Sequence, residues 1–432
     1  MADAKHPDRA AIEAGQLGQL RSLVAELIPA NKFYTQKLQS VGAGFDLASL
    51  ADFASRFPFT TKAEVVADQL SQPPYGANLT YPLDRYTRFH QTSGTTGTPM
   101  RWLDTPESWD AMIECWLEIF RAANVRAADR VCFAFSFGPF LGFWLAFEAA
   151  QRLGCLCLPG GGLSSSGRLR MMLANQPTTL CCTPTYAIRL AEVATEEKIA
   201  TASLGVKTII VAGEPGGSIP ATRAKLESLW PGARIFDHHG MTEVGPVTYE
   251  CPAQPGVLHV IESAHFAEVI DPGSGKPARS GELVLTTLTR VGSPLLRYRT
   301  GDLVKLVTRH SSLVTSPCSC GRHELALEGG ILGRVDDMVI VRGVNIYPTA
   351  VEETIRGFRE IAEYRVQISQ ENSLAEMRIE IEPAAETSNI SELLARVGKA
   401  FESSLALRVA ISAVPPGTLP RFEMKAQRWI RS

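Results

Sequence analysis

Residues 92–99 form a run of small hydroxyl and glycine residues, TSGTTGTP. Glycine lets the backbone approach a ligand closely, and consecutive N–H groups together with hydroxyls can cradle phosphate oxygens. The lysine-containing phosphate motif is absent, and no lysine occurs between Lys62 and Lys198. A flexible surface loop would have the same composition, so only further motifs can distinguish it from a phosphate-binding loop. The candidate phosphate contacts are Thr92, Ser93, Gly94, Thr95, Thr96 and Gly97.

A second group of residues has the types and spacing of a metal site. Three cysteines and one histidine lie in polar segments rich in proline and glycine, at Cys251, His259, Cys318 and Cys320. Three thiolates and one imidazole would complete a tetrahedral Zn²⁺ site. The C-x-C spacing is tighter than the usual C-x-x-C, so exposed thiols placed by chance are the alternative. We expect structural zinc without a catalytic role, because all four ligands would be protein atoms.

The segment FAFSFGPFLGFW, residues 133–144, concentrates aromatic side chains. Aromatic rings bind a flat apolar acid by stacking and by burying its surface, although each ring taken singly could be plain core. The rings that flank the Gly-Pro turn are the candidates for substrate contact, at Phe135, Phe137 and Phe140. The stretch contains no lysine or arginine for a second anionic group, which disfavours dicarboxylic substrates.

These candidate residues lie in a chain of 432 residues, long enough for two or three domains. Its net charge is -2 at pH 7, so no basic excess indicates nucleic acid or an anionic membrane as a partner. The polar amino terminus is not a signal peptide, and the apolar stretch 131–150 contains Gly138-Pro139 and Glu148, which argues against a membrane span. Nine cysteines without an export signal predict free thiols in a reducing cytoplasm.

A framework of alternating strands and helices has to position the motifs. Apolar segments near residues 131–135, 154–159, 179–184 and 206–213 each precede a helical pattern, and ARIFDHHG follows the last of these helices. This alternation predicts an α/β domain with parallel sheets flanked by helices. Separate helices are expected over residues 11–28, 108–123 and 140–153, with Thr60 or Thr61 as a helix N-cap.

From about Val257 the pattern changes to short alternating segments, HFAEVI, GELVLTTL, LLRYRT and DLVKLV. They predict a small barrel-like β subdomain within the large domain. A last segment contains two further strand patterns and one helix, which suggests a small mobile α+β domain. We expect a large domain over residues 1–332 and a C-terminal domain over residues 333–432.

Six motifs follow one another in fixed order: TSGTTGTP, GEPG, HHGMTEVGP, YRTGDL, GRVDDMVIVRG and LPRFEMKAQR. In this order they resemble the adenylate-forming acid ligases, and the short chain with PFTTK and CCTPTYA is most similar to the phenylacetate–coenzyme A ligases. The resemblance spans most of the chain. It implies activation of a carboxylic acid with ATP and Mg²⁺ and transfer of the acyl group to a thiol. The aromatic stretch would then line the acid pocket, and similar Cys/His positions occur in some relatives.

The resemblance also implies roles for residues of the middle motifs. Glu243 would help to hold Mg²⁺, and Thr242 would approach the α-phosphate. His239 stands where relatives usually have a tyrosine stacked on adenine. The remaining nucleotide contacts would be Gly213, Glu214, Pro215, Gly240 and Met241, and the acid contacts beyond the aromatic rings would be His238 and Gly240.

The last motifs would complete the site. By the same resemblance, Asp302 would accept the ribose hydroxyls, a task that suits a carboxylate, and Arg334 would pair with ribose or phosphate. Asp336 would be the hinge about which the C-terminal domain rotates. Lys425 would reach across the domain interface and bridge the acid carboxylate and the α-phosphate. Gly343 would approach the thiol channel after rotation.

The sequence therefore predicts an ATP- and Mg²⁺-dependent ligase that joins an aromatic acid, similar to phenylacetate or benzoate, to coenzyme A. Two alternatives stay open: adenylation with an amine, carrier protein or alcohol as acceptor, and a zinc-stabilised binding protein without activity. We expect no nucleic acid or membrane partner, and the sequence leaves a homodimer open.

Overall fold

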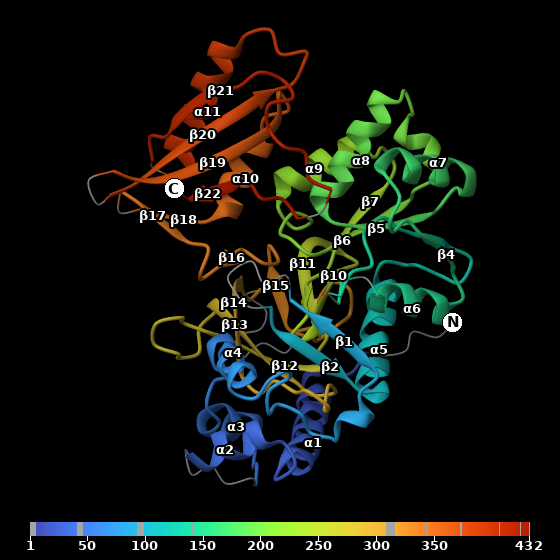
Figure 1. Ribbon diagram of the computed structural model, residues 1–432, viewed down its shortest axis with the longest axis vertical. Coiled ribbons are helices and arrows are strands. Elements are labelled where there is room, and N and C mark those ends of the chain that lie inside the picture. Colours follow the sequence, from blue (N-terminus) through green and yellow to red (C-terminus); the bar gives the residue numbers. More distant parts are fainter. Residues whose placement is uncertain are drawn as a thin grey trace.

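The structure, a computed structural model, arranges the chain as a large part that runs the whole height of the molecule and a C-terminal part docked beside its upper half (Figure 1). It describes residues 6–40, 46–92, 99–139, 141–142, 144–307, 316–342, 344–371, 374–405, 407–423 and 425–431.

A five-stranded parallel sheet forms the centre of the large part, in the order β4-β3-β5-β6-β7. Its strands are β3 (Arg130–Phe133), β4 (Leu156–Pro159), β5 (Thr179–Cys182), β6 (Thr208–Val211) and β7 (Arg234–Asp237). Side chains alternate between the two faces of a strand, so Val131 and Phe133 enter one apolar cluster and Cys132 enters the other. The α/β class is the one predicted.

Helices cover both faces of this sheet. One face carries α5 (Pro106–Ala122) and α6 (Trp144–Leu153), and the other carries α7 (Ser165–Asn175), α8 (Pro184–Glu196) and α9 (Pro220–Leu229). The helix expected from residue 140 begins at Trp144 instead, and Gly142 before it has a left-handed φ of 42° that a helix cannot contain. The apolar stretch 131–150 is thus divided between β3 and α6. No described helix combines the length and apolar character that a membrane crossing requires.

Short elements precede the sheet. The amino-terminal helices are α1 (Arg9–Leu27), α2 (Lys32–Ser40), α3 (Leu50–Arg56) and α4 (Lys62–Ser71), followed by η1 (Leu83–Arg85). Thr61 caps α4 in a capping box with Glu64, one of the two alternatives predicted. The hairpin of β1 (Arg88–Gln91) and β2 (Arg101–Asp104) then carries residues 92–100 between its strands. A further short helix, η2 (Thr201–Leu204), lies between α8 and β6.

The segment after β7 forms antiparallel sheets. The strands are β8 (Gly240–Met241) with β9 (Gly245–Pro246); β10 (Thr248–Cys251), β11 (Gln254–Val260) and β15 (Ala326–Glu328); and β12 (His265–Ile270), β13 (Ser280–Thr287), β14 (Tyr298–Lys305) and β16 (Gly333–Arg334). The two strands expected in LLRYRT and DLVKLV are one strand, β14. It continues through Gly301, whose φ of 78° accompanies a register shift against β13.

The C-terminal part has its own apolar core. It contains β17 (Val339–Val341), β18 (Val344–Ile346), α10 (Pro348–Arg356), β19 (Ile361–Glu371), β20 (Leu374–Pro383), α11 (Ile390–Leu405), β21 (Ala410–Ala413) and β22 (Trp429–Arg431). Its sheet has the order β21-β20-β19-β22. The division at residue 333 stays a prediction. The first strand beyond it, β16, pairs with β14 of the large part.

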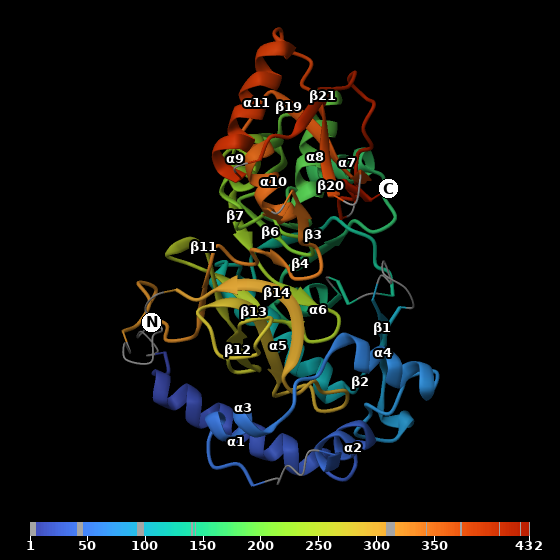
Figure 2. The same ribbon diagram turned by 90° about the vertical axis from the view of Figure 1, so that its left-hand side faces the viewer.

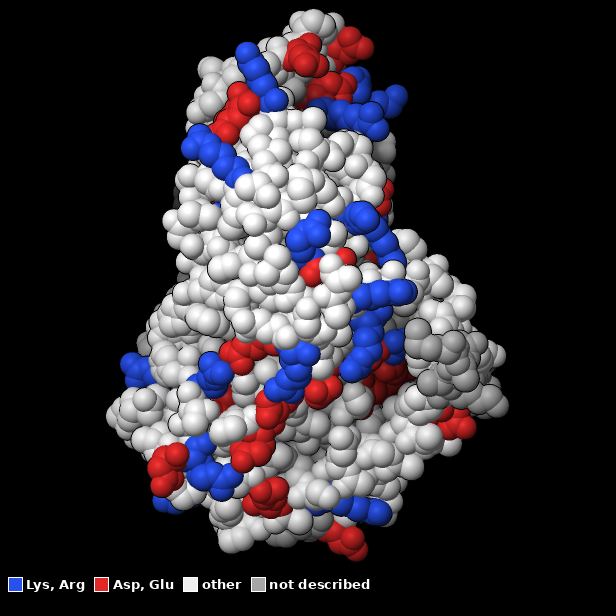
Figure 3. Space-filling view, turned by 90° about the vertical axis from the view of Figure 1, so that its right-hand side faces the viewer, with Lys and Arg blue, Asp and Glu red and all other residues white. Residues whose placement is uncertain are grey.

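The C-terminal part docks on the layer formed by α7, α8 and α9 (Figure 2). Glu353 of α10 accepts a hydrogen bond of 3.0 Å from the backbone N–H of Ala221, at the amino end of α9. Helix amino termini carry unpaired N–H groups and favour a carboxylate. Lys225 donates to the Ile361 carbonyl at 3.2 Å. On the face in Figure 3, lysine and arginine are interspersed with aspartate and glutamate, in keeping with the small net charge.

Candidate active site

The ends of the candidate phosphate loop are held together where the loop connects β1 to β2, next to the pair Gln91–Arg101. The Thr92 N–H donates to the Met100 carbonyl at 2.9 Å, and the Met100 N–H donates to Thr92 Oγ1 at 3.0 Å. The two β-strands therefore present the loop from a fixed base. The predicted contacts Ser93, Gly94, Thr95, Thr96 and Gly97 lie outside the described residues.

Thr242 and Glu243 lie in the turn between β8 and β9. The Glu243 carboxyl is only 9% exposed, and burial raises its pKa, although the charges of Lys62 and Arg334 oppose the shift. The predicted residues Gly240 and Met241 form β8, and a Cβ on Gly240 would meet the Gly245 carbonyl at 2.9 Å. The tight β8–β9 hairpin thus requires glycine and sets where Glu243 points.

Asp302, Arg334 and His239 converge beside this turn. Arg334 donates to Asp302 Oδ1 at 2.9 Å, and His239 Nε2 lies 3.2 Å from Asp302 Oδ2. Arg334 also forms a two-pronged pair with Asp336. Gly301 allows this approach, because a Cβ there would lie 2.9 Å from Arg334 Nη2. The structure therefore brings the predicted ribose, phosphate and hinge residues into one ionic cluster.

Lys425 reaches the large part although it lies only seven residues before the last residue of the sequence. A Cβ on Gly213 would lie 3.6 Å from Lys425 Cε, and Gly213 has a φ of 96° that favours glycine. The lysine is exposed, and its ammonium has no ion-pair partner among the described residues. An ammonium group without an ion-pair partner among the described residues therefore lies beside the carboxyl ends of the parallel strands.

Glu214, the residue after Gly213, fixes the segment that carries this lysine. Its carboxylate accepts from the Thr185 N–H at the start of α8 and from the Ala426 N–H, both at 2.9 Å. One side chain therefore joins a helix of the large part to the residue after Lys425. The sequence reasoning placed Glu214 among the nucleotide contacts and missed this bridge, since nothing in a GEP motif indicates a partner more than two hundred residues away.

The aromatic residues expected to contact the acid lie at the carboxyl end of β3. The rings of Phe135 and Phe137 are 4.9 Å apart, and Phe137 meets Trp144 edge-on at 4.6 Å. Phe135 is buried in the main apolar cluster, while Phe137 is half-buried. Phe140 lies outside the described residues.

His238 is buried at the end of β7, edge-on to Trp116 at 4.6 Å. Its Nδ1 lies 2.7 Å from the Thr248 carbonyl, which can only accept, so Nδ1 carries the proton. Complete burial lowers the pKa of His238 to about 3 and keeps the ring neutral.

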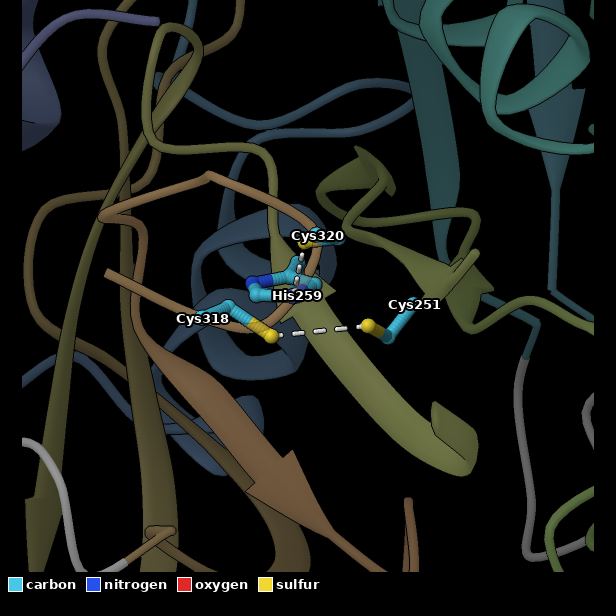
Figure 4. A group of neighbouring side chains, drawn as sticks. All are labelled: Cys251, His259, Cys318 and Cys320. Carbon is cyan, nitrogen blue, oxygen red and sulfur yellow. Dashed lines mark hydrogen bonds between the residues drawn. The ribbon is translucent and has the colours of Figure 1, made fainter. Parts of the chain in front are cut away.

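The candidate zinc ligands converge in the β subdomain (Figure 4). Their ligand atoms all lie within 4.8 Å of one another, with Cys251 Sγ 3.5 Å from Cys318 Sγ and Cys320 Sγ 3.5 Å from His259 Nε2. Cys251 ends β10, His259 lies on β11, and the two other cysteines flank a turn. The contact between the thiols of Cys251 and Cys320 lowers the pKa of Cys251 and raises that of Cys320. All nine cysteines are free, as expected.

Asp336 and Gly343 were predicted near the domain connection, and Lys62 is a candidate that was not predicted. Asp336 lies in the turn between β16 and β17, whereas Gly343 lies outside the described residues. Lys62, at the start of α4, is close enough to lower the pKa of Asp336 together with Arg334, against the effect of burial. Lys62 ends the PFTTK motif, so the sequence contained a signal for a cation near this site.

Comparison with known proteins agrees with this geometry. The family model of the AMP-binding enzymes matches residues 88–286, and the model of the AMP-binding enzyme C-terminal domain matches residues 343–432. The chain is 30% identical to the phenylacetate-coenzyme A ligase of Thermus thermophilus, over 96% of this chain and 95% of that one.

Solved structures of 2-hydroxyisobutyryl-CoA ligase share the fold at 27–28% identity, covering 100% of this chain and 93% of theirs. In the postadenylation state with 2-HIB-AMP the TM-score is 0.92, whereas in the thioesterification state with 2-HIB-AMP and CoA it is 0.74. The two parts of this chain are therefore arranged more like the postadenylation state. The chain belongs to the adenylate-forming AMP-binding enzymes, among the relatives of phenylacetate–coenzyme A ligase, and it is an AMP-forming acid–coenzyme A ligase.

Proposed function

We propose that this ligase activates an aromatic carboxylic acid as its acyl-adenylate and then transfers the acyl group to coenzyme A. The observation that carries the proposal is the position of Lys425, which Glu214 holds against the large part beside Gly213. An ammonium at that place can neutralise charge that develops between the acid carboxylate and the α-phosphate. The resemblance to a neighbour in the postadenylation state supports the same reading.

The chain's own residues provide the remaining parts of adenylation. Thr92 and the loop after it would receive the β- and γ-phosphates through hydroxyl and N–H groups. Asp302 would take the ribose hydroxyls through its buried carboxylate, one oxygen of which already accepts from Arg334. His239, whose Nε2 lies 3.2 Å from Asp302 Oδ2, would lie at the adenine with Gly213, Glu214 and Pro215.

Glu243 fits a magnesium ion, and Thr242 beside it would approach the α-phosphate. A carboxylate is a hard oxygen ligand of the kind that Mg²⁺ prefers, together with phosphate oxygens and water. The Glu243 carboxylate accepts a hydrogen bond from its own backbone N–H, and no side chain among the described residues donates to it. When bound, the ion would neutralise phosphate charge, while Glu243 holds its place at the turn.

Support for an aromatic acid comes from the neighbouring rings of Phe135 and Phe137, and His238 is a neutral polar group packed on Trp116. Stacked and edge-on rings suit a flat apolar acid. A short hydroxy acid is the second candidate, because the structural neighbour at TM-score 0.92 is named for 2-hydroxyisobutyrate. His238 Nε2 is then the unprotonated ring nitrogen and can accept a hydrogen bond from a substrate hydroxyl.

We propose that coenzyme A enters after the C-terminal part rotates about Asp336 and brings Gly343 to the site. The difference in TM-score between the two states of the neighbour supports such a movement. A compartment with reduced thiols, the cytoplasm, suits the nine free cysteines.

The cluster of Cys251, His259, Cys318 and Cys320 fits structural zinc. A tetrahedral ion with bonds of about 2.3 Å to sulfur places its sulfur ligands roughly 3.8 Å apart, close to the separation in this cluster. We propose that zinc joins the β10–β11 hairpin to the turn at residues 318–321 and takes no part in the reaction.

Acid-dependent exchange of pyrophosphate into ATP tests the proposal. A panel should include phenylacetate, benzoate, 2-hydroxyisobutyrate and straight-chain acids, each with and without coenzyme A. We expect exchange with an aryl acid and acceleration of AMP release by free coenzyme A. Exchange without that acceleration would indicate an amine, carrier protein or alcohol as acceptor. Exchange only with 2-hydroxyisobutyrate would replace the aromatic acid by a hydroxy acid, and no exchange with any acid would contradict the proposed function.

A further inference from the structure

Arg290 is one of the largest fully buried side chains of the protein, with 1% of its surface exposed. It lies three residues beyond the end of β13, in a segment that crosses behind the β1–β2 hairpin. A buried guanidinium is costly unless its fork of five N–H donors is filled. The partners that fill it show what this side chain connects.

Half of the fork is directed at the hairpin that carries the phosphate loop. Nε and Nη2 donate to the two carboxylate oxygens of Asp104 at 2.6 and 2.7 Å. Asp104 is the last residue of β2, is fully buried, and also lies 3.9 Å from the ring nitrogen of His90 on β1. The guanidinium outweighs the effect of burial and holds the pKa of Asp104 below its usual value.

The other half of the fork is directed at the turn between β8 and β9. Nη1 donates to the Thr242 carbonyl at 2.7 Å and to the Glu243 carbonyl at 2.9 Å. These are the backbone groups of the two residues to which we assign the magnesium ion and the α-phosphate. One buried side chain therefore joins the base of the phosphate loop to the backbone beneath Glu243.

We propose that Arg290 and Asp104 are positioning residues that fix the β1–β2 hairpin relative to the β8–β9 turn that carries Glu243, so that one Mg²⁺–ATP complex can contact both elements. The inference rests on the proposed function. Neither side chain reaches substrate, because both are buried. A small displacement of either element would misplace a ligand that has to touch both, and such misplacement lowers affinity and rate together.

A matched control lies in the same part of the molecule. Arg297 is also buried, forms a two-pronged pair with Glu268 at 3.0 and 2.8 Å, and donates to the Phe57 carbonyl at 2.5 Å. Its carbonyl partner belongs to no site residue. Arg290→Lys and Arg297→Lys therefore remove the same fork from comparable pairs. Asp104→Asn is a second test variant, which keeps the side-chain shape and removes its charge.

The experiment measures the rise in Tm caused by ATP over a series of Mg²⁺ concentrations, and acid-dependent pyrophosphate exchange over the same series. We expect both lysine variants to lose similar Tm without ligand. Arg290→Lys and Asp104→Asn should need at least ten-fold more Mg²⁺ for the half-maximal Tm rise and exchange, whereas Arg297→Lys should change by less than two-fold. Equal Mg²⁺ requirements in Arg290→Lys and Arg297→Lys would overturn the inference.

Hydrogen exchange on the natural chain tests the connection without any substitution. Mg²⁺–ATP should slow amide exchange in residues 88–104 and 239–248 together, and leave the segment around Glu268 unchanged. Protection of one of these segments without the other would overturn the inference. If the natural chain binds Mg²⁺–ATP but exchanges pyrophosphate with no acid, the proposed function fails while the Tm series still decides on Arg290.

Discussion

The candidate active site and the Cys/His cluster are both polar centres, but the chain builds them in opposite ways. The active site takes residues from the β1–β2 hairpin, the β8–β9 turn, β14, β16 and the far end of the C-terminal part. The four cluster residues come from β10, β11 and one turn before β15, which are neighbours in a single sheet. One centre depends on the orientation of two domains, and the other depends on one local sheet.

The two centres also differ in how their polar atoms are satisfied. In the candidate active site Asp302 Oδ2 and His239 Nε2 face each other at 3.2 Å without hydrogen-bond geometry, and the Lys425 ammonium has no ion-pair partner among the described residues. In the cluster the four ligand atoms face one another, and His259 Nδ1 behind them is also buried without a hydrogen bond in the described part of the chain. The exposed cation at Lys425 is therefore what separates the two centres. Under the proposed function it leaves the first centre open to substrates, whereas the four ligands of the second would close around one ion.

The largest expected effect breaks the active site alone. Lys425→Ala should lower acid-dependent pyrophosphate exchange by a hundred-fold or more, about 3 kcal/mol, because removing one placed charge or donor from a transition state typically costs that much. Its Tm should not change, since the lysine is exposed and forms no ion pair with the described residues.

Lys399→Ala is the control for this variant, because Lys399 is an exposed lysine on α11 of the same C-terminal part. Its exchange rate should equal that of the natural chain. Near-normal exchange by Lys425→Ala would remove the lysine from the mechanism.

The second effect breaks the cluster alone. Cys320→Ser should lower the zinc content from about one per chain toward zero, and should lower the free energy of unfolding by more than about 2 kcal/mol, since metal binding contributes directly to folding. Metal analysis and thermal unfolding measure the two changes. Cys157→Ser, outside the cluster, is the matched control and should keep its metal.

The rate of pyrophosphate exchange per folded molecule of Cys320→Ser should stay normal below its Tm. A reaction defect without a stability defect would contradict the contrast between the two centres. Absence of zinc from the purified natural chain would contradict the proposed zinc site.

The smallest effect concerns pH. The pKa of His238 is about 3 in the folded protein and about 6.5 in an unfolded chain, so only the unfolded chain takes up this proton between the two values. Stability should therefore fall by about 1.4 kcal/mol per pH unit from this residue as pH drops below 6.5, and should not change above it.

His238→Asn keeps a donor for the Thr248 carbonyl and cannot take up the proton. Urea unfolding of both proteins at pH 5 and pH 7.5 isolates the contribution of His238 to the pH dependence of stability, because the other groups titrate alike in both proteins. Equal pH dependence in the two proteins would show that the imidazole at His238 is charged in the folded state.

Much of the framework could be predicted from the sequence. Alternating apolar and helical patterns lead to a parallel sheet because each segment is short and local. The convergence of Cys251, His259, Cys318 and Cys320 could also be predicted, since three cysteines and one histidine in polar segments have the composition of a tetrahedral metal site.

The remaining features depend on long-range partners. Arg290 looks like an ordinary basic residue in a turn, and only the fold shows that it is buried against Asp104. The bridge from Glu214 to Ala426 depends on a domain orientation that no local pattern contains. Strand β14 runs through Gly301 because tertiary pairing overrides the local preference of glycine for a turn.

The backbone pairing at the start of the C-terminal part ends just before the proposed hinge. Gly333 and Arg334 pair with Leu303 and Asp302, and the Val335 N–H still donates to the Gly301 carbonyl at 2.7 Å. Asp336 is the next residue along the chain. If the C-terminal part rotates about it as proposed, the pivot lies where this seam of hydrogen bonds ends, and lengthening the seam by one pair would move the axis of rotation along the chain.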